Sequence, residues 1–179
     1  LELFPSEFEE SELGMIPMGW EVVRFKELIG KYIDNRGKTP PHQEYGIPLL
    51  EVKNLPKEVL TPGYPVQKYV TEETYNTWFR SHLEADDTLI STVGTIGLTN
   101  IVPADSKFTI AQNVLGLRAN TNYLEKKYLY YMMKSRSFLN DIDARLVTTV
   151  QSSIKRKDLE TIDCLVPSPG IQKKFVSLI

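Results

Sequence analysis

The segment from Asp86 to Asn120 constrains the fold of this chain more than any other. It holds three short runs rich in Val, Ile, Leu and Thr, which span residues 88–93, 97–102 and 113–118. This composition is typical of half-buried β-strands, and glycine, proline and aspartate between the runs indicate bends. The loop from Ser91 to Gly97 is polar and glycine-rich, so its backbone can approach a ligand closely. A tight hairpin with a glycine bulge is the plainer alternative for the same loop.

The length and composition fit a single globular domain. The 179 residues include 41% hydrophobic and 25% charged side chains, which is enough for a sizeable core in an ordinary soluble protein. No apolar run approaches the ~20 residues that a membrane helix needs, and the first residues lack the pattern of a signal segment. The single cysteine, Cys164, excludes an internal disulfide and is expected to be a buried core thiol. A cytoplasmic protein with no membrane partner is the expectation.

The charge is unevenly distributed along the chain. The formal net charge is −2, but residues 1–16 contain five glutamates and no basic side chain. The rest of the chain has 21 basic and 18 acidic side chains, a net charge of +3. This balance mildly favours a polyanionic partner and does not decide the question.

The other segments predict strands and helices joined by polar loops. Strands are expected at residues 20–25, 47–52 and 159–166, and helices at 26–33, 71–80, 122–134, 138–146 and 170–179. Two helices carry start signals: Thr71 is placed to cap the helix 71–80, and Asn122 with Glu125 makes a capping-box-like start for 122–134. Three aromatic residues on one face of the helix 71–80 are expected to be buried, namely Tyr75, Trp78 and Phe79.

The sequence supplies no recognisable catalyst, metal centre or cofactor loop. It lacks the G-x-x-x-x-G-K-[ST] and G-x-G-x-x-G loops and the Asn/Asp-Pro-Pro-aromatic tetrapeptide that adenine methyltransferases carry. His42 and His82 are far apart and have no cysteine nearby, so neither a zinc site nor a hydrolase triad is predicted. The adjacent acidic pair Asp86-Asp87 is expected to be solvated or to cap a helix. We therefore expect a protein that is not an enzyme and needs no cofactor of its own.

Four polar loops contain the side chains that reading DNA requires. Arg and Lys bind guanine edges or phosphates, Asn and Gln bind adenine edges, and Ser and Thr hydroxyls bind either. The predicted DNA-binding residues are Arg36, Lys38 and Gln43; Lys53 and Asn54; Ser91, Thr92 and Thr95; and Arg145, Thr148, Thr149, Gln151, Ser152, Lys155 and Arg156. In the last loop we expect Gln151 to contact a base edge, and Arg145 and Arg156 to hold phosphates or guanine. Each loop taken alone fits an ordinary solvated surface equally well.

Several stretches, taken in order, resemble one protein family. Residues 87–102 read D-x-L-I-S-x-V-G-x-I-G-x-x-x-I-V, and residues 111–118 read A-x-N-V-x-x-L-R. The others are G-M-I-P-M-G-W-E-V-V from Gly14, G-I-P-L-L-E-V-K-N-L from Gly46, and D-L-E-T-I-D-C-L-V-P-S-P from Asp158, followed by Q-K-K-F-V from Gln172. Residues 12–179 are thus similar to the target recognition domain of type I restriction-modification specificity subunits.

The resemblance implies that the chain selects the DNA sequence for a modification and restriction complex by reading one half of a bipartite site. Its implied partners are double-stranded DNA, methyltransferase (M) subunits and, through them, restriction (R) subunits. S-adenosylmethionine, ATP and magnesium would be bound by those partners. It also implies an acidic linker or tail at 1–15, a recognition domain at 16–168 and the start of a spacer helix at 169–179. Because only one recognition domain is present, an excised half or a half-subunit that dimerises through the spacer helix is expected.

The last helix shows an interface pattern of its own. Ile171, Phe175 and Leu178 fall at i, i+4 and i+7, with Lys173 and Lys174 on the other side. This spacing predicts a partner-docking face, and a core helix of the same domain is the alternative.

The expected fold is α+β (mixed), a twisted and partly curled β-sheet with helices packed on one side. Two other functions stay open. One is the recognition domain of a fused restriction-methylation enzyme, whose catalyst would precede Leu1. The other is a protein-interaction module that does not bind DNA, for which the acidic overall charge is the main argument.

Overall fold

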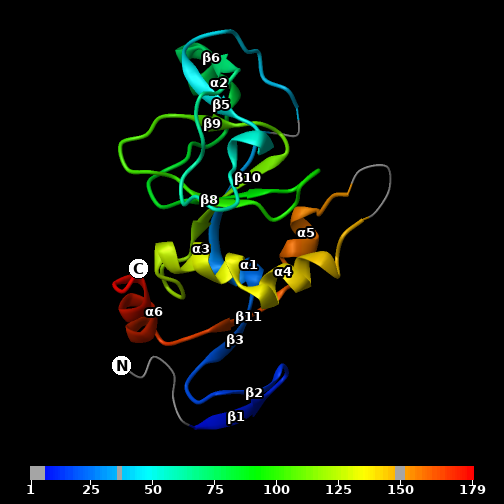
Figure 1. Ribbon diagram of the computed structural model, residues 1–179, viewed down its shortest axis with the longest axis vertical. Coiled ribbons are helices and arrows are strands. Elements are labelled where there is room, and N and C mark those ends of the chain that lie inside the picture. The colour runs from blue at the N-terminus through cyan, green and yellow to red at the C-terminus, as the bar shows by residue number, and fades with distance from the viewer. Residues whose placement is uncertain (1–6, 36–37, 148–151) are drawn as a thin grey trace.

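The structure is a computed structural model that describes residues 7–35, 38–147 and 152–179. Its central feature is a four-stranded sheet in the order β4-β10-β7-β8, with every neighbouring pair antiparallel (Figure 1). These strands are Ile29–Ile33, Val114–Ala119, Thr88–Ser91 and Thr99–Ile101. The three β-rich runs of the sequence are therefore neighbours in one sheet, as their composition predicts.

Strand β4 differs from the sequence expectation, which placed a helical turn at 26–33. The helix α1 is a single turn, Phe25–Leu28, and the chain continues directly into β4. Phe25 and Leu28 are fully buried in the core beneath the sheet. The β-branched and aromatic residues that follow favour pairing with β10 over a second helical turn.

A smaller three-stranded sheet, in the order β6-β5-β9, lies at one end of the molecule (Figure 1). Its strands are Ile47–Leu50, Tyr69–Val70 and Thr109–Ile110 for β5, β6 and β9, and the pair β5–β9 is parallel. The 3₁₀ turn η1 (Val52–Asn54) follows β5, and the helix α2 (Glu72–Trp78) follows β6. Thr71 caps α2 by accepting a hydrogen bond from the backbone N–H of Thr74, and Phe79 is buried beside Tyr75 and Trp78. The predicted cap is confirmed, whereas the predicted burial of the three aromatic residues holds fully for Phe79 only, because Tyr75 and Trp78 are half-buried.

Two consecutive helices, α3 (Lys126–Lys134) and α4 (Arg136–Asp143), make up the main helical layer. α3 packs against β7, β8 and β10 of the central sheet. Leu117, Leu129 and Met133 are fully buried at this contact, and a fully buried side chain of this kind contributes about 1.5–3 kcal/mol. The expected start at Asn122 is wrong, because Glu125 is the cap and accepts from the N–H of Tyr128.

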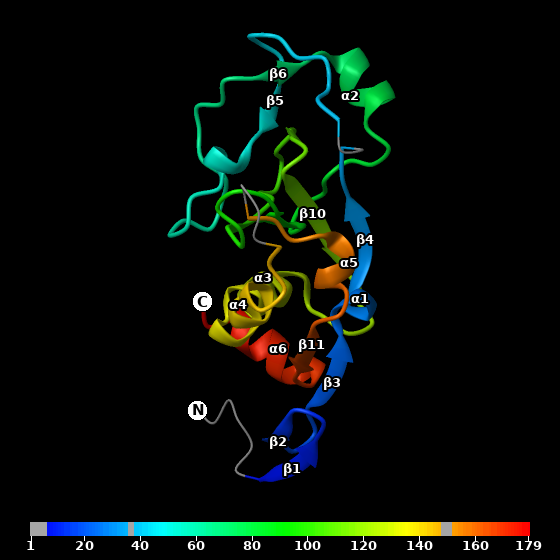
Figure 2. The same cartoon turned by 90° about the vertical axis from the view of Figure 1, so that its right-hand side faces the viewer.

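The C-terminal part supplies a second small sheet and two helices. The strand β11 (Asp163–Val166) pairs antiparallel with β3 (Glu21–Arg24), below the helical layer (Figure 2). The expected strand 159–166 is shorter than predicted, because the helical turn α5 (Arg156–Leu159) ends at Leu159 and a turn follows it before Asp163. The helix α6 (Pro169–Val176) follows β11. Cys164 is buried as expected, and burial raises the pKa of its thiol to about 12.

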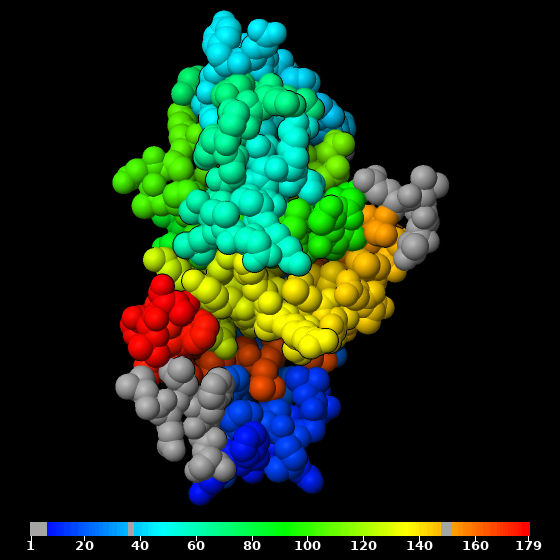
Figure 3. All heavy atoms as spheres, in the orientation of Figure 1, coloured from blue at the N-terminus to red at the C-terminus, as the bar shows by residue number. Residues whose placement is uncertain are grey.

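The segment expected to be a tail contains a β-hairpin. Its strands are β1 (Phe8–Ser11) and β2 (Gly14–Pro17), and it projects from the end of the molecule opposite the three-stranded sheet (Figure 3). Gly14 has a φ of 90°, which glycine adopts at little cost and which closes the turn. The strands are mostly exposed and rich in glutamate, so the alternation of apolar and polar residues that indicates a strand is missing. The division of the chain at residues 15 and 168 stays a prediction.

Candidate functional site

Two adjoining depressions carry most of the polar groups that could bind a ligand. The first, here called the Arg80 groove, has a volume of about 390 Å³ and is lined by Asp34, Asn35, Arg80, Thr92, Gln112, Val114, Leu115, Ile154 and Arg156. The second, the Lys53 hollow, has a volume of about 290 Å³ and is lined by Thr39, Pro40, Leu49, Glu51, Val52, Lys53, Lys68, Ala111, Gln112 and Asn113. Gln112 lines both, so the two depressions meet at the loop between β9 and β10.

The structure brings two of the predicted loops together beside the Arg80 groove. The backbone N–H of Gly94 donates to the carbonyl of Ser152 at 3.1 Å, and the N–H of Ile154 donates to the carbonyl of Thr92 at 3.0 Å. Val93 and Ser153 form an isolated β-bridge between the same segments. The β7–β8 loop and the segment before α5 therefore form one continuous edge of the groove.

The buried side chain of Ser91 stabilises the β7–β8 loop through two hydrogen bonds to its backbone. It is fully buried, and its hydroxyl donates to the carbonyl of Thr95 at 2.6 Å and accepts from the N–H of Leu98 at 2.9 Å. Gly94 and Gly97 both have a φ of 80°, the left-handed region that favours glycine. Thr95 is exposed at the tip, while the hydroxyl of Thr92 donates to the carbonyl of Asn113. Of the three predicted contacts in this loop, only Thr95 presents an exposed side chain.

Lys53 and Asn54 have different environments although they are adjacent. Asn54 is 5% exposed; its side-chain oxygen accepts from the N–H of Glu51, and its side-chain nitrogen donates to the carbonyl of Gly63. This side chain holds η1 in place and is not presented to a ligand. Lys53 is exposed and lies 2.9 Å from Glu51. Burial acts to raise the pKa of Glu51, but hydrogen bonds and charge from Lys68 and Lys53 outweigh it and leave the pKa lowered.

Two predicted arginines are already engaged within the protein. Arg145 donates to the carboxylate of Asp141 and to the hydroxyl of Thr161, at 2.9 and 3.1 Å. Its guanidinium is therefore fixed between α4 and the turn after α5, where it does not line either depression. Arg156 lines the Arg80 groove, stacks over the ring of Tyr32 at 3.8 Å and pairs with Glu160 at 2.8 Å. Burial, then the charge of Glu160, raises the pKa of Tyr32 to about 12.

The other predicted residues divide into four groups. Lys38 and Lys155 are exposed and make no ion pair with any residue that the structure describes. The backbone of Gln43 bridges to Tyr69, and its amide donates to the carbonyl of Tyr45. Ser152 is half-buried at the groove edge. Arg36, Thr148, Thr149 and Gln151 lie outside the described residues, so the expected base contact by Gln151 stays a prediction.

Three residues at the two depressions were missed by reading the sequence. Arg80 follows α2 and Gln112 lies between β9 and β10; both are exposed, while Asn35 at the end of β4 is buried. Gln112 had a signal, since it occupies the variable position of the A-x-N-V pattern between two residues that build the sheet. Arg80 and Asn35 carry no comparable sequence signal, because only the folded chain brings their segments to the same groove.

An ion pair with a buried carboxylate joins the start of β7 to β10. Asp87 is 2% exposed and accepts two hydrogen bonds from Arg118, at 3.0 and 2.8 Å. Arg118 also pairs with Glu84 at 2.7 Å, and the hydrogen bond that Arg118 donates to Asp87, opposed by burial, raises the pKa of Arg118. The expectation that Asp87 is solvated or capping is therefore wrong. Asp87 and Arg118 are the first residue of the D-x-L-I-S pattern and the last of the A-x-N-V-x-x-L-R pattern, so one contact joins both patterns.

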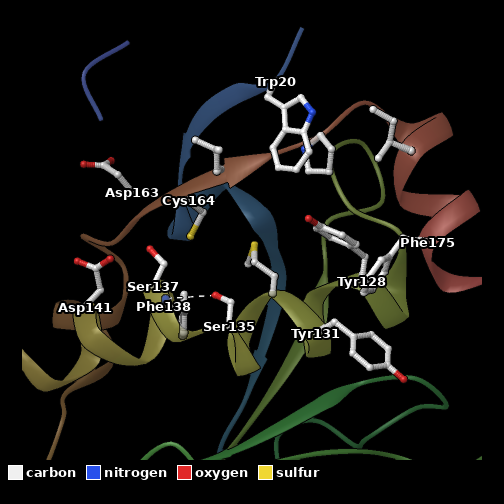
Figure 4. A pocket seen from close by; sticks show the side chains of 14 residues that line it. Trp20, Tyr128, Tyr131, Ser135, Ser137, Phe138, Asp141, Asp163, Cys164 and Phe175 are labelled. Carbon is white, nitrogen blue, oxygen red and sulfur yellow. Dashed lines mark hydrogen bonds between the residues drawn. The ribbon is translucent and has the colours of Figure 1, made fainter. Parts of the chain in front are cut away.

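The predicted docking helix α6 borders an apolar pocket of about 320 Å³ at the other end of the domain (Figure 4). Trp20, Tyr128 and Phe175 reach this pocket from three different segments. Phe175 contacts the edges of Tyr128 and Tyr131, with ring centroids 5.7 and 5.5 Å apart. Ile171 also lines the pocket, whereas Leu178 is 55% exposed. Part of the predicted docking face therefore packs on its own domain.

Other classes of site find no support in the described part of the chain. No group of three or more His, Cys, Asp or Glu side chains there is arranged to hold a metal ion. Among the helices of residues 7–35, 38–147 and 152–179, none has the length and apolar character needed to cross a membrane.

Comparison with known proteins adds an independent line of argument. Residues 17–179 match the family model described as "Type I restriction modification DNA specificity domain". The "Putative type I restriction enzyme MjaX specificity subunit" of Methanocaldococcus jannaschii is 30% identical over 93% of this chain and 37% of its own length. The type I restriction enzyme MjaVIII specificity subunit of the same organism is 24% identical over 93% of this chain and 40% of its own length.

Solved structures of low sequence identity share the fold. The crystal structure of the HsdS subunit from Thermoanaerobacter tengcongensis has a TM-score of 0.67 and 21% identity, covering 96% of this chain and 39% of that chain. The S subunit of a type I restriction-modification system from M. genitalium has a TM-score of 0.52 and 16% identity, over 89% and 37%. The mixed α+β fold expected from the sequence is confirmed. The chain spans about two fifths of the length of the relatives that it matches.

The matched family model covers nearly the whole chain, and its region contains every sequence pattern described above except the first residues of the one that begins at Gly14. On that ground, the chain belongs to the family of type I restriction-modification DNA specificity domains.

Proposed function

We propose that this chain recognises a specific sequence of double-stranded DNA, one half of a bipartite site, on behalf of a type I restriction-modification complex. Its partners in this proposal are M subunits and, through them, R subunits, and it acts in the cytoplasm. Catalysis, S-adenosylmethionine, ATP and magnesium belong to those partners. Membership of the specificity-domain family supports this function over a fused enzyme or a protein-interaction module.

The observation that carries the proposal is the position of Gln112. It is exposed where the two depressions meet, with Arg80 and Arg156 along one and Lys53 and Lys68 along the other. Arg156 on one side of this amide and Lys53 and Lys68 on the other can hold phosphates while the amide reaches a base edge, an arrangement that suits a duplex. Thr95, Lys38 and Lys155 are further exposed groups that we assign to phosphate contacts. Dimerisation and docking of partners through Ile171, Phe175 and Leu178 stay proposals of the same kind.

Replacing Gln112 by alanine is expected to reduce sequence preference. A lost amide contact to a base edge weakens binding to the preferred duplex by about 1–3 kcal/mol and changes binding to random duplex much less. Fluorescence anisotropy with both duplexes measures the two affinities. Equal losses on both duplexes, or none on either, would remove Gln112 from base recognition.

Replacing Arg156 by alanine is expected to weaken binding to all duplexes about equally. A lost phosphate contact also lowers the slope of log K against log salt by about 0.9. The matched control is Lys173→Ala, an exposed cation on α6 that lines neither depression. Titrations at four salt concentrations compare the slopes. A slope that falls for Lys173→Ala and not for Arg156→Ala would place the DNA on the other face of the molecule.

A further inference from the structure

Asn35 is an unusual buried residue in the Arg80 groove. Its side chain is 1% exposed, and neither the nitrogen nor the oxygen of its amide has a hydrogen-bond partner in the described part of the chain. The other buried amides in the described part of the chain each make hydrogen bonds: Asn54 makes the contacts given above, and Gln172 makes three to backbone groups. The nitrogen of Asn100 donates to the carbonyls of Pro56 and Val59, although its oxygen has no partner there. A buried amide without partners costs stability, and a ligand that supplies a donor and an acceptor recovers it.

Two further side chains at the same groove have unused hydrogen-bonding capacity. Arg80 and Gln112 are exposed and make no side-chain hydrogen bond or ion pair with the residues that the structure describes. The remaining polar groups of the groove are occupied, since Arg156 pairs with Glu160 and Thr92 donates to Asn113. Asn35, Arg80 and Gln112 come from three separate segments, and the groove is the place where they meet.

The character of the groove favours a base edge over a phosphate. Val114, Leu115 and Ile154 give it an apolar wall. Amide side chains pair with the N6 and N7 positions of adenine, and a guanidinium pairs with the O6 and N7 positions of guanine.

We propose that Asn35, Arg80 and Gln112 form the base-reading centre of the interface and that they select purines through the major groove. Asn35 and Gln112 pair with adenine, and Arg80 pairs with guanine. In the complex with DNA, the amide of Asn35 makes the hydrogen bonds that it lacks in the free protein. This inference rests on the DNA-binding function proposed above.

The test combines folding and selectivity in the full chain. Asn35→Leu removes an unpartnered amide, so its melting temperature is expected to equal or exceed that of the wild type. Asn54→Leu is the matched control, because it removes an amide whose bonds are made, and its melting temperature is expected to fall. Selection from a randomised duplex pool, followed by sequencing, then gives the preferred sequence of the wild type and of Asn35→Leu, Arg80→Ala and Gln112→Ala.

The selected duplex is also made with 7-deazapurines, which lack the N7 acceptor. We expect the wild type to lose affinity about tenfold or more for the 7-deaza duplex, and each variant to lose preference at one purine position. A wild type that enriches no sequence overturns the DNA-reading function and this site with it. Wild-type preference that persists in all three variants, or a wild type indifferent to the 7-deaza duplex, overturns this site and leaves DNA reading in place. A melting temperature of Asn35→Leu that falls as far as that of Asn54→Leu likewise overturns it, because Asn35 is then a structural amide.

Discussion

Replacing Arg118 by methionine is expected to lower the free energy of unfolding by about 3–5 kcal/mol, because it leaves the carboxylate of Asp87 buried without its counter-ion. Asp87 is 2% exposed and receives both of its guanidinium hydrogen bonds from Arg118. Its remaining bond comes from the backbone N–H of Glu84, at 2.8 Å. One neutral donor does not compensate a buried charge. Urea denaturation followed by circular dichroism measures the loss.

Two further variants serve as controls for Arg118→Met. Arg24→Met removes an ion pair to Asp163 in which the arginine side chain is 52% exposed, and a loss below about 1 kcal/mol is expected. The double variant Arg118→Met with Asp87→Leu removes both charges and is expected to recover most of the loss. If Arg118→Met is no more destabilising than Arg24→Met, the ion pair does not hold the start of β7 to β10.

Replacing Gln172 by leucine is expected to lower the free energy of unfolding by about 2–5 kcal/mol, because it removes the hydrogen-bond partner of three backbone groups, one of them in a buried contact and two in half-buried ones. Gln172 is fully buried; it accepts from the N–H of Glu125 and donates to the carbonyls of Tyr123 and Pro167, each at 2.8 Å. These bonds attach α6 to the start of α3. Thermal and urea unfolding of the variant measure the effect.

The control for Gln172→Leu replaces a residue of the same C-terminal segment whose side chain makes no hydrogen bonds of this kind. Leu178 is 55% exposed, so Leu178→Ala is expected to change the stability by no more than about 0.5 kcal/mol. This pair of variants compares two environments in the C-terminal segment, since Gln172 is buried in the domain and Leu178 is exposed. A stable Gln172→Leu variant would mean that α6 is not an integral part of the domain.

The strands of the central sheet could be predicted because their signal is local. The runs in 88–102 and 113–118 are rich in β-branched residues and are separated by glycine and proline, and all three became neighbouring strands. Thr71 likewise carries its cap signal within four residues. By contrast, the helix expected at 26–33 is wrong for residues 29–33, because only pairing with the distant strand β10 selects the strand β4 there.

The candidate site was less predictable from the sequence, because burial and contacts between distant segments decide which side chains are available to a ligand. Ser91 and Asn54 have the chemistry of DNA-reading residues, but the fold uses both inside the protein. Arg145 is bonded to Asp141 one helical turn away, so its guanidinium is also used within the protein. Gln112 and Arg80 lie far apart in sequence, and nothing local places them at one groove.

The most direct test of DNA recognition is the ratio of two affinities. The duplex enriched from a randomised pool by the wild-type chain is titrated at about 0.15 M salt, beside a scrambled duplex of the same length and composition. Recognition through the groove at Gln112 predicts a preference of about a hundredfold or more for the enriched duplex, and a loss of most of it in Gln112→Ala. Equal affinity for the two duplexes, or no binding to either at low salt, would contradict the proposal that this domain reads DNA.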